Sequence, residues 1–364
     1  MKFAVNRLDF IRILEPTVKV ASGKQMAILG NVLLTAESGR IKACGYNLSV
    51  AVTTSATAAI DESGAACIDG HAIAAFLQKC DEPNVIVDTA DMRMNVKCGK
   101  ARTSLMYALA DDYPKAESLS DTANEVILKS SELFNAVKTA GYAAADDCPR
   151  KELECINVAI DKNSIKIVSC DGNRAAVYTK KLSCNIPKTA SFGLFKNDVK
   201  TVMSIITSEN ITLRYNDKHL EIIGGGIAVM TSLSAKQYPN IEALVEKSTK
   251  TVSQSITVDS NELKETLSKI TALPKIGGDV PVRIDVGHDK MQFLYNFGNG
   301  IFTDEIECEL NGEPFTVGVK TMFLSDMLKS ADGNIVLNCN GSAGAITLQR
   351  ENISQMIMPM RLRK

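Results

Sequence analysis

The residues that could do chemistry are few, and the most suggestive group is a glycine run beside scattered acids. Gly224, Gly225 and Gly226 close the apolar segment HLEIIGGG, and the candidate catalytic acids are Asp146, Asp147 and Asp171. A loop that cradles phosphates leads into a helix, whose N-terminus faces the anion. Here IAVMTSL follows, which has the character of a second strand. The pattern therefore favours a hairpin turn over a nucleotide-binding enzyme.

Metal and thiol sites are poorly supported. The 10 cysteines form no CxxC pair, and the closest two, Cys148 and Cys155, are seven residues apart. The histidines, His71, His219 and His288, stand in dissimilar contexts. Zinc and redox sites need closely spaced ligands, so we expect no metal and no cofactor. Most cysteines are expected to be small buried apolar residues in a reducing compartment.

Length and charge narrow the function further. The chain has 364 residues, enough for two or three domains, with 45% hydrophobic and 23% charged residues. No apolar run is long enough to cross a membrane, and charged residues interrupt the N-terminal segment, so we expect a cytoplasmic protein. The net charge is −1, from 41 Lys and Arg against 42 Asp and Glu. If DNA is the partner, local positive charge must hold it.

A threefold repeat organises the chain. FAVNRLDFIRIL, VILKSSELFNAVKTA and ITVDSNELKETLSKI each predict a strand followed by a helix. The first helix of each repeat has an expected apolar face, formed by Leu8, Ile11 and Leu14; Leu133, Val137 and Ala140; and Leu263, Leu267 and Ile270. Each repeat also has a second predicted helix. The apolar stripes of these three helices begin at Ile73, Val199 and Leu324, which lie 126 and 125 residues apart. The period is therefore a whole domain.

Strand pairs with polar turns fill the rest of each repeat. Examples are VLLTAESGRIKACG, NVAIDKNSIKIVSC and VRIDVGHDKMQFLY between the two helices. We predict an α+β fold of three domains, 1–122, 123–249 and 250–364, each with two helices on one face of antiparallel sheets. Polar stretches near 117–125 and 246–255 mark the joints. Three such domains in tandem can curve into an arc with the helices inside. We expect this arc to close by head-to-tail pairing with a second copy of the chain.

The chain resembles the bacterial sliding clamps, the beta subunits of DNA polymerase III, over its whole length. The residues that carry the resemblance are the N-terminal MKF, AILGNVLL (27–34), CDGNRAAV (170–177), KQYPNIEAL (236–244) and MPMRL (358–362). The resemblance implies the DNA clamp fold, a homodimeric ring around duplex DNA, and processivity without catalysis. Implied partners are double-stranded DNA of any sequence, the replicative polymerase alpha subunit, the clamp loader delta subunit, translesion polymerases and mismatch repair proteins.

A sliding ring should contact phosphates and avoid base edges. By resemblance, the DNA contacts are Lys24, His71, Arg150, Lys151 and Lys196. Further lysines on the predicted helices add local positive charge, namely Lys138, Lys200, Lys269, Lys320 and Lys329. Lysine suits this task because it is a flexible, hydrated phosphate contact rather than a bidentate reader. The alternative for any single lysine is a solvated helix face.

The resemblance also implies an apolar pocket that binds short linear peptides from the protein partners. The matching positions are Ile156, Cys170, Gly172, Asn173, Arg174, Ala175, Val177, Pro239, Ala243, Leu244, Ala345, Met356, Ile357, Met358, Pro359, Met360, Arg361 and Leu362. Methionine adapts to ligands of different shape. The alternative for the terminal MIMPM run is a last core strand.

Several positions depart from the family pattern. The family usually has Thr, His and Leu where Cys170, Asn173 and Ala175 stand, and often a long basic residue at Ala243. We expect a larger pocket with altered peptide preference. Arg363 and Lys364 extend the chain past MPMRL.

The ring interface is implied at Thr103 and Leu105 on an edge strand, facing Ala272 and Leu273 of a second copy. Thr103 and Ala272 are smaller or more polar than the family's usual residues. We therefore expect a dimer of moderate stability. Two other classes stay open: an enzyme built on the glycine run, and a repeat scaffold that gathers proteins without encircling DNA.

Overall fold

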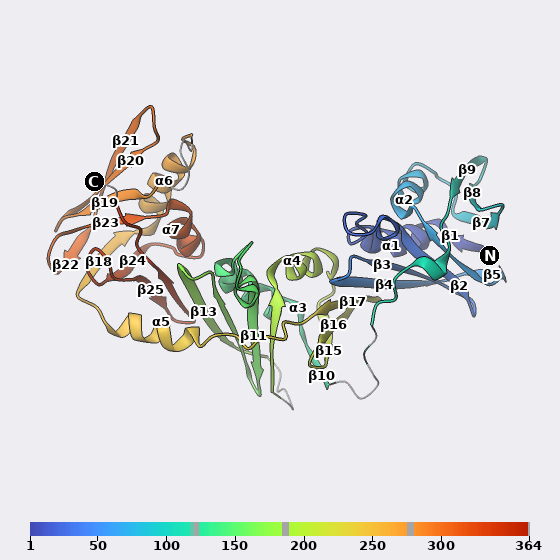
Figure 1. Cartoon of the computed structure of the whole chain (residues 1–364), viewed down its shortest axis with the longest axis horizontal. Helices are drawn as coiled ribbons and strands as arrows, with labels where there is room; N and C mark the ends of the chain where they lie inside the picture. Colours follow the sequence, from blue (N-terminus) through green and yellow to red (C-terminus); the bar gives the residue numbers. More distant parts are fainter. Residues whose placement is uncertain (118, 120–123, 184–188, 275–279, 363–364) are drawn as a thin grey trace. The chain divides into compact units, whose positions relative to one another are not determined.

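The computed structural model describes residues 1–117, 119, 124–183, 189–274 and 280–362 (Figure 1). Arg363 and Lys364, which extend the chain past MPMRL, lie outside the described residues. The chain divides into two compact units. The first unit comprises 1–132 and 197–235, and the second comprises 133–196 and 236–364. The middle repeat thus contributes to both units, and the three domain boundaries stay a prediction.

Two antiparallel sheets form the first unit. The five-stranded sheet has the order β5 (Ala59–Glu62), β1 (Lys2–Asn6), β7 (Asn84–Ala90), β8 (Arg93–Cys98) and β9 (Ala101–Met106). The eight-stranded sheet has the order β10 (Asn124–Lys129), β15 (Asn210–Tyr215), β16 (His219–Gly224), β17 (Ile227–Ser232), β4 (Val50–Thr57), β3 (Arg40–Tyr46), β2 (Val32–Glu37) and β6 (Gly64–Ile68). The β17–β4 pair joins strands of the middle repeat to strands of the first.

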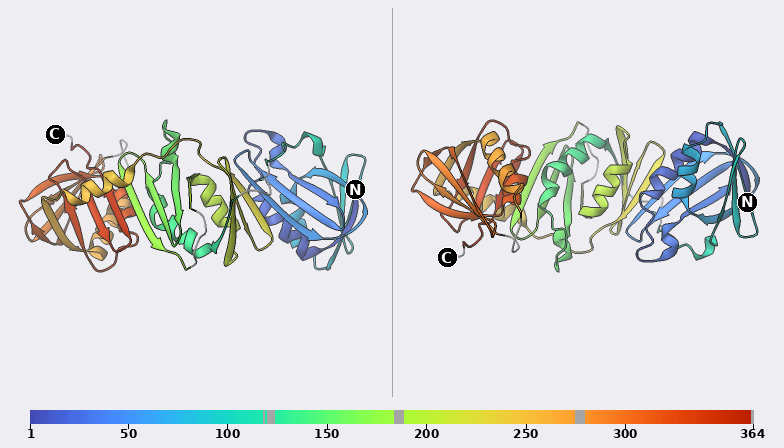
Figure 2. Two further views of the ribbon diagram at one scale, coloured as in Figure 1. Left: turned by 90° about the horizontal axis from the view of Figure 1, so that it is seen from below. Right: turned by 90° about the horizontal axis from the view of Figure 1, so that it is seen from above.

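The helices α1 (Arg7–Val18) and α2 (Gly70–Gln78) pack side by side in the first unit, with α1 against β3 and β4 (Figure 2). The Asn6 side chain accepts hydrogen bonds from the Leu8 and Asp9 amides and so begins α1. Phe10, Ile11, Ile13 and Leu14 of α1 are buried. The expected place of Leu8 on that face was wrong, since Leu8 is 64% exposed. It lies in the first turn, ahead of the turns that cover the sheet.

The second unit also has two antiparallel sheets. The nine-stranded sheet has the order β14 (Ala190–Phe195), β11 (Cys155–Asp161), β12 (Ser164–Cys170), β13 (Arg174–Lys181), β26 (Ile353–Ile357), β25 (Ile346–Arg350), β24 (Asn334–Cys339), β18 (Gln254–Asp259) and β22 (Glu309–Asn311). The four-stranded sheet has the order β21 (Ile301–Glu307), β20 (Lys290–Asn296), β19 (Val282–Val286) and β23 (Phe315–Val319). The β13–β26 pair joins the middle repeat to the last.

The remaining helices complete the predicted repeat. The middle repeat contains α3 (Ser130–Ala140) and α4 (Lys196–Ile205), and the last contains α6 (Ser260–Thr271) and α7 (Thr321–Leu328). Short 3-10 turns are η1 (Ala27–Gly30), η2 (Ala110–Asp112), η3 (Gly141–Ala143) and η4 (Lys151–Glu154). The strand-then-helix start recurs as β1–α1, β10–α3 and β18–α6, which confirms the repeat. In the part of the chain that is described, no helix is long and apolar enough to span a membrane.

One helix was not expected. The predicted polar joint near 246–255 overlaps α5 (Ile241–Lys250), which begins where the Asn240 side chain accepts a hydrogen bond from the Ala243 amide. Ile241 and Val245 are the buried residues of this helix, and both pack into the second unit. Two apolar residues one helical turn apart are enough to fix the helix against a sheet.

Candidate functional site

An apolar cluster in the second unit gathers five of the expected pocket positions. Cys170, Ala175 and Met356 are buried in it, and Val177 and Ala345 pack against it half-buried. Four further residues belong to the same cluster, namely Val168, Tyr238, Ile241 and Val245. We call these nine residues together the pocket cluster. Sequence reasoning missed the four further residues, although the helical spacing of Ile241, within KQYPNIEAL, and Val245, directly after it, could have indicated those two.

Strand register explains why these residues meet. In the β12–β13 hairpin Cys170 lies opposite Ala175, and across the β13–β26 pair Ala175 lies opposite Met356. Cross-strand neighbours on one face lie within contact distance. At the hairpin turn Asp171 Oδ1 accepts hydrogen bonds from the amides of Asn173 at 2.9 Å and Arg174 at 3.0 Å. Gly172 has φ +93°, which favours glycine there.

The C-terminal segment is held beside this turn. The Met358 amide donates to the Asn173 carbonyl at 2.7 Å, and the Met360 amide donates to the Gly318 carbonyl at 2.8 Å. A Cβ atom at Gly318 would lie 2.6 Å from the Met360 carbonyl oxygen, so the close approach requires glycine. Met358 is 38% exposed and Leu244 of α5 is 47% exposed. Large apolar side chains therefore reach solvent from two elements of the second unit, and α5 packs on β13 and β26.

The other expected pocket residues have varied positions. Ile156 is buried in β11, where it lies opposite Leu194 and packs against Gly141, so it belongs to a different contact set from the pocket cluster. Ile357 is buried in the core of the last repeat. Pro239 and Ala243 lie at the start of α5, while Pro359 and Arg361 continue the terminal segment and Leu362 lies against Gly318.

Arg174 is buried below the hairpin turn. Its side chain is 6% exposed, and it forms ion pairs with Asp171 at 2.8 Å and with Asp326 of α7 at 2.5 Å. The guanidinium also lies 4.5 Å from the centre of the Phe323 ring. The expectation named Arg174 as a pocket residue, but sequence reasoning missed Asp326, because no local pattern relates residues 152 positions apart.

The expected DNA contacts fall into exposed and buried groups. In the first unit, Lys24 is exposed in the turn after α1, and His71 is exposed in the first turn of α2. In the second unit, Arg150 and Lys151 are 61% and 57% exposed, and they pair with Glu152 at 3.0 Å and Glu154 at 2.7 Å. The hydrogen bond with Glu154 raises the pKa of Lys151, which keeps it charged.

Lys196 differs from these four. Its side chain is 11% exposed, its Nζ donates to the Ala144 carbonyl at 2.7 Å, and it lies 2.9 Å from Asp146. Three protein oxygens surround the ammonium group when the Tyr142 carbonyl, at 3.5 Å, is included. The geometry indicates an anchor for the 142–146 segment rather than a free phosphate contact.

The expected interface residues flank two sheet edges. Thr103 and Leu105 are half-buried on β9, the last strand of its sheet as described, and Leu105 packs against the core of the first unit. Ala272 caps the C-terminal end of α6, and the next residue, Leu273, packs against the core of the last repeat. The strand β21 forms the corresponding edge of the four-stranded sheet.

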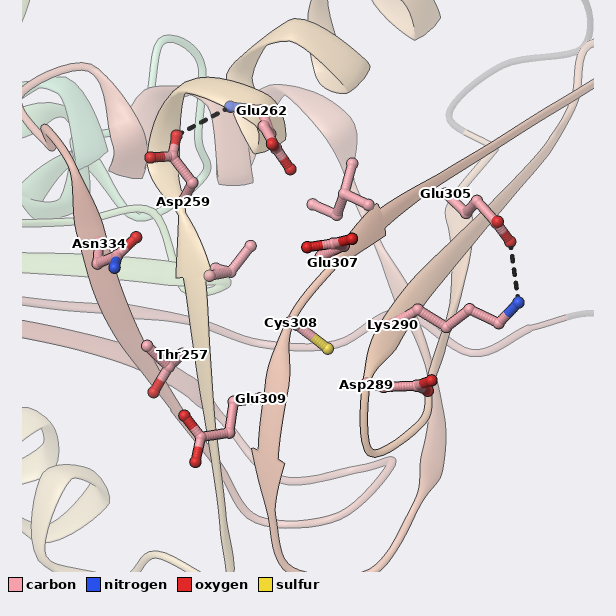
Figure 3. Close-up of a pocket in the computed structure, with 12 residues that line it drawn as sticks. Thr257, Asp259, Glu262, Asp289, Lys290, Glu305, Glu307, Cys308, Glu309 and Asn334 are labelled. Atoms are coloured by element: carbon pink, nitrogen blue, oxygen red, sulfur yellow. Dashed lines mark hydrogen bonds and ion pairs between the residues drawn. The ribbon is translucent and has the colours of Figure 1, made fainter.

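An acidic hollow lies beside β21 in the second unit. Its lining includes Asp259, Glu262, Asp289, Glu305, Glu307 and Glu309, with Lys290 paired to Glu305 at 3.2 Å (Figure 3). Asp259 is occupied as the cap of α6, accepting from the Asn261 and Glu262 amides. Throughout the described ranges, no group of three or more His, Cys, Asp or Glu side chains could hold a metal ion. The hollow is therefore a negatively charged surface.

The glycine run has the expected role of a turn. Gly225 and Gly226 have φ +62° and +79° and connect β16 to β17. Asp146 pairs with Lys196, and Asp171 pairs with Arg174. Asp146 and Asp171 are thus held by structural partners on separate segments.

Comparison with known proteins shows what the chain is similar to. Residues 1–117 match the family described as DNA polymerase III beta subunit, N-terminal domain. The beta sliding clamp of Synechococcus elongatus is 22% identical over 358 residues, covering 94% of both chains. A putative DNA polymerase III beta subunit from Eubacterium rectale shares the fold with a TM-score of 0.90 at 18% identity, covering 99% of both chains. The sliding clamp from Pseudomonas aeruginosa bound to griselimycin has a TM-score of 0.85 at 17% identity, covering 100% of both chains.

The fold is thus that of the DNA clamps along the whole chain. The first third of the chain matches the N-terminal domain of the DNA polymerase III beta subunits, and the chain as a whole is similar to the bacterial beta sliding clamps.

Proposed function

We propose that two copies of this chain close head to tail into a ring around duplex DNA and tether the replicative polymerase to it without catalysing a reaction. The observation that carries the proposal is a pair of sheet edges with opposite charge. The exposed charged residues of β8, β9 and the turn between them are basic, namely Arg93, Lys97, Lys100 and Arg102. On β21 and the segment that follows, the exposed charged residues are acidic, namely Glu305, Glu307 and Glu309.

Complementary edges favour heterologous pairing between copies. Joining β9 of one copy to β21 of another would satisfy backbone groups that an open edge leaves unpaired. Leu105 and Leu273, half-buried at the margins of their cores, would supply the apolar part of the contact. The small side chain of Ala272 supports a dimer of moderate stability.

The proposed DNA contacts are Lys24, His71, Arg150 and Lys151. All four are exposed, and exposed lysine and arginine can exchange carboxylate partners for phosphates as a duplex slides. We leave Lys196 out because protein oxygens occupy its ammonium group. The location that fits this function is the cytoplasm, where bacterial DNA is found.

The pocket cluster, with Leu244 and Met358 at its exposed side, is the proposed site for short peptides of the polymerase alpha subunit, the loader delta subunit and repair proteins. Griselimycin serves as the probe, and we propose that it binds this chain at the same cluster. Replacing Met358 or Leu244 with Ala should weaken its binding, because each removes exposed apolar area that a ligand would cover.

Two experiments test the ring. Light scattering across a concentration series should give about twice the 39.3 kDa monomer mass. The loaded protein should stay on nicked circular DNA and leave when the circle is linearised. A mass of one copy at every concentration, or equal loss from both DNA forms, rejects the ring and favours the scaffold alternative.

A further inference from the structure

The two strands β13 and β26, which carry residues of the pocket cluster, are both hydrogen-bonded to the same turn of α7. From β13, Arg174 reaches Asp326 at 2.5 Å. From β26, the Gln355 Nε2 donates to the Met327 carbonyl at 3.1 Å. The strands that carry Ala175 and Met356 therefore share an anchor made of two consecutive residues of α7.

A buried aromatic side chain links the two anchors. Tyr142 of η3 accepts a hydrogen bond from Gln355 Nε2 at 2.9 Å, and its ring lies 5.6 Å from the Arg174 guanidinium. Gln355 is fully buried and Arg174 nearly so. A polar network at this depth has strong geometric preferences, because each lost partner leaves a desolvated group unpaired.

The anchor reaches the exposed side of the pocket through the hairpin turn. Arg174 holds Asp171 at 2.8 Å, and Asp171 in turn accepts from the amide of Asn173. The Asn173 carbonyl then accepts from the Met358 amide at 2.7 Å. The place of Met358 thus depends, through four short contacts, on where Asp326 holds the guanidinium.

We propose that Asp326 is a positioning residue for peptide binding: it fixes Arg174 and, through it, the turn that places Met358, without touching the peptide itself. The Nε and Nη1 donors of Arg174 are both bonded to carboxylates, and the side chain is 6% exposed. Arg174 is therefore a buried structural residue that holds the hairpin turn against α7. This inference rests on the pocket proposed above.

The test compares griselimycin binding by calorimetry to the full-length chain and its variants. Asp326→Asn should weaken binding about tenfold, since the amide cannot hold the guanidinium as a carboxylate does. Asp326→Glu should recover most of the affinity, because it restores the charge at nearly the same place. Tyr142→Phe, which keeps the ring and removes the acceptor for Gln355, should weaken binding about threefold.

The matched control is Glu221→Gln. It removes the pair between Arg214 and Glu221 in the first unit, at 3.0 Å and with side chains 25% and 21% exposed, and should leave binding unchanged. Melting curves are recorded for every variant. If Asp326→Asn does not fold, Asp171→Asn, which weakens the next contact of the same path, decides the proposal, and normal griselimycin binding by that variant rejects it.

The outcomes separate the two proposals. No binding to the unaltered chain, or no effect of Met358→Ala, rejects the pocket itself. Normal binding by a folded Asp326→Asn, an effect equal to that of Glu221→Gln, or no recovery in Asp326→Glu rejects the positioning role while the pocket stands.

Discussion

Arg174 and Arg150 lie in the same compact unit and both face carboxylates, yet they are built for different tasks. Arg174 is 6% exposed and held by two acids, whereas Arg150 is 61% exposed and pairs with one. A buried arginine paired with two carboxylates holds its surroundings in place, because moving it would leave buried charges without a partner. An exposed pair contributes little stability and is easily exchanged. The difference matches the two proposed roles, a peptide pocket that must keep its form and a DNA-binding surface that must release its ligand.

The largest effect is expected for Arg174→Ala. Removing the guanidinium leaves Asp171 without its cation and Asp326 with only the exposed Lys329, which should lower the free energy of unfolding by about 3–5 kcal/mol. Urea unfolding measures this change. Arg283→Ala, which removes an exposed partner of Asp285, is the control and should cost under about 1 kcal/mol. Equal losses in the two variants would erase the distinction between buried and exposed arginines.

Ala175→Leu probes the space beside Arg174. Sequence reasoning expected a larger pocket here, yet Ala175 is fully buried. Overfilling a packed site should lower the free energy of unfolding by about 1–3 kcal/mol. A more stable variant with tighter griselimycin binding would show instead that the alanine leaves usable room. Calorimetry and urea unfolding of the same sample distinguish these results.

A half-exposed network should give an intermediate, pH-dependent effect. Burial raises the pKa of Asp304, but hydrogen bonds from Thr266 and Lys269 outweigh it and leave the pKa below its ordinary value. The carboxylate therefore stabilises the fold above about pH 4, and this stability is lost as the pH falls through the lowered pKa. Melting temperatures of Asp304→Asn should lie below those of the unaltered chain at pH 7 and converge with them in acid. A constant difference down to about pH 2 contradicts this.

The smallest effect on stability is expected for the exposed basic residues. Replacing Lys24, Arg150 and Lys151 together with Ala should leave the unfolding midpoint and the dimer mass unchanged, and should lower retention on circular DNA. The salt dependence of binding should fall by about 0.9 in logarithmic slope for each phosphate that the variant no longer neutralises. Lys129→Ala, an exposed lysine paired with Glu209, is the control. Unchanged retention in the triple variant rejects these residues as DNA-binding groups.

The sequence predicted what depends on neighbours along the chain. Polar turns between alternating segments predicted the β2–β3, β11–β12 and β19–β20 hairpins, and helical spacing predicted α6 and α7. Predictions that depended on packing were less secure. Leu8 has the right spacing but lies beyond the covered face, and Lys196 has the right type but a buried position. The partner of Arg174 could not be predicted, because the ion pair with Asp326 exists only once the sheet and α7 have packed.

The β17–β4 and β13–β26 pairs have a consequence for how such a chain can evolve. At both places strands of adjacent repeats are joined by a ladder of main-chain amides and carbonyls. These groups are present whatever side chains stand on the strands. Substitutions can therefore accumulate on either side of each joint while the joint itself is inherited unchanged. A chain that retains only 22% identity to the Synechococcus elongatus clamp can in this way keep its repeats in register.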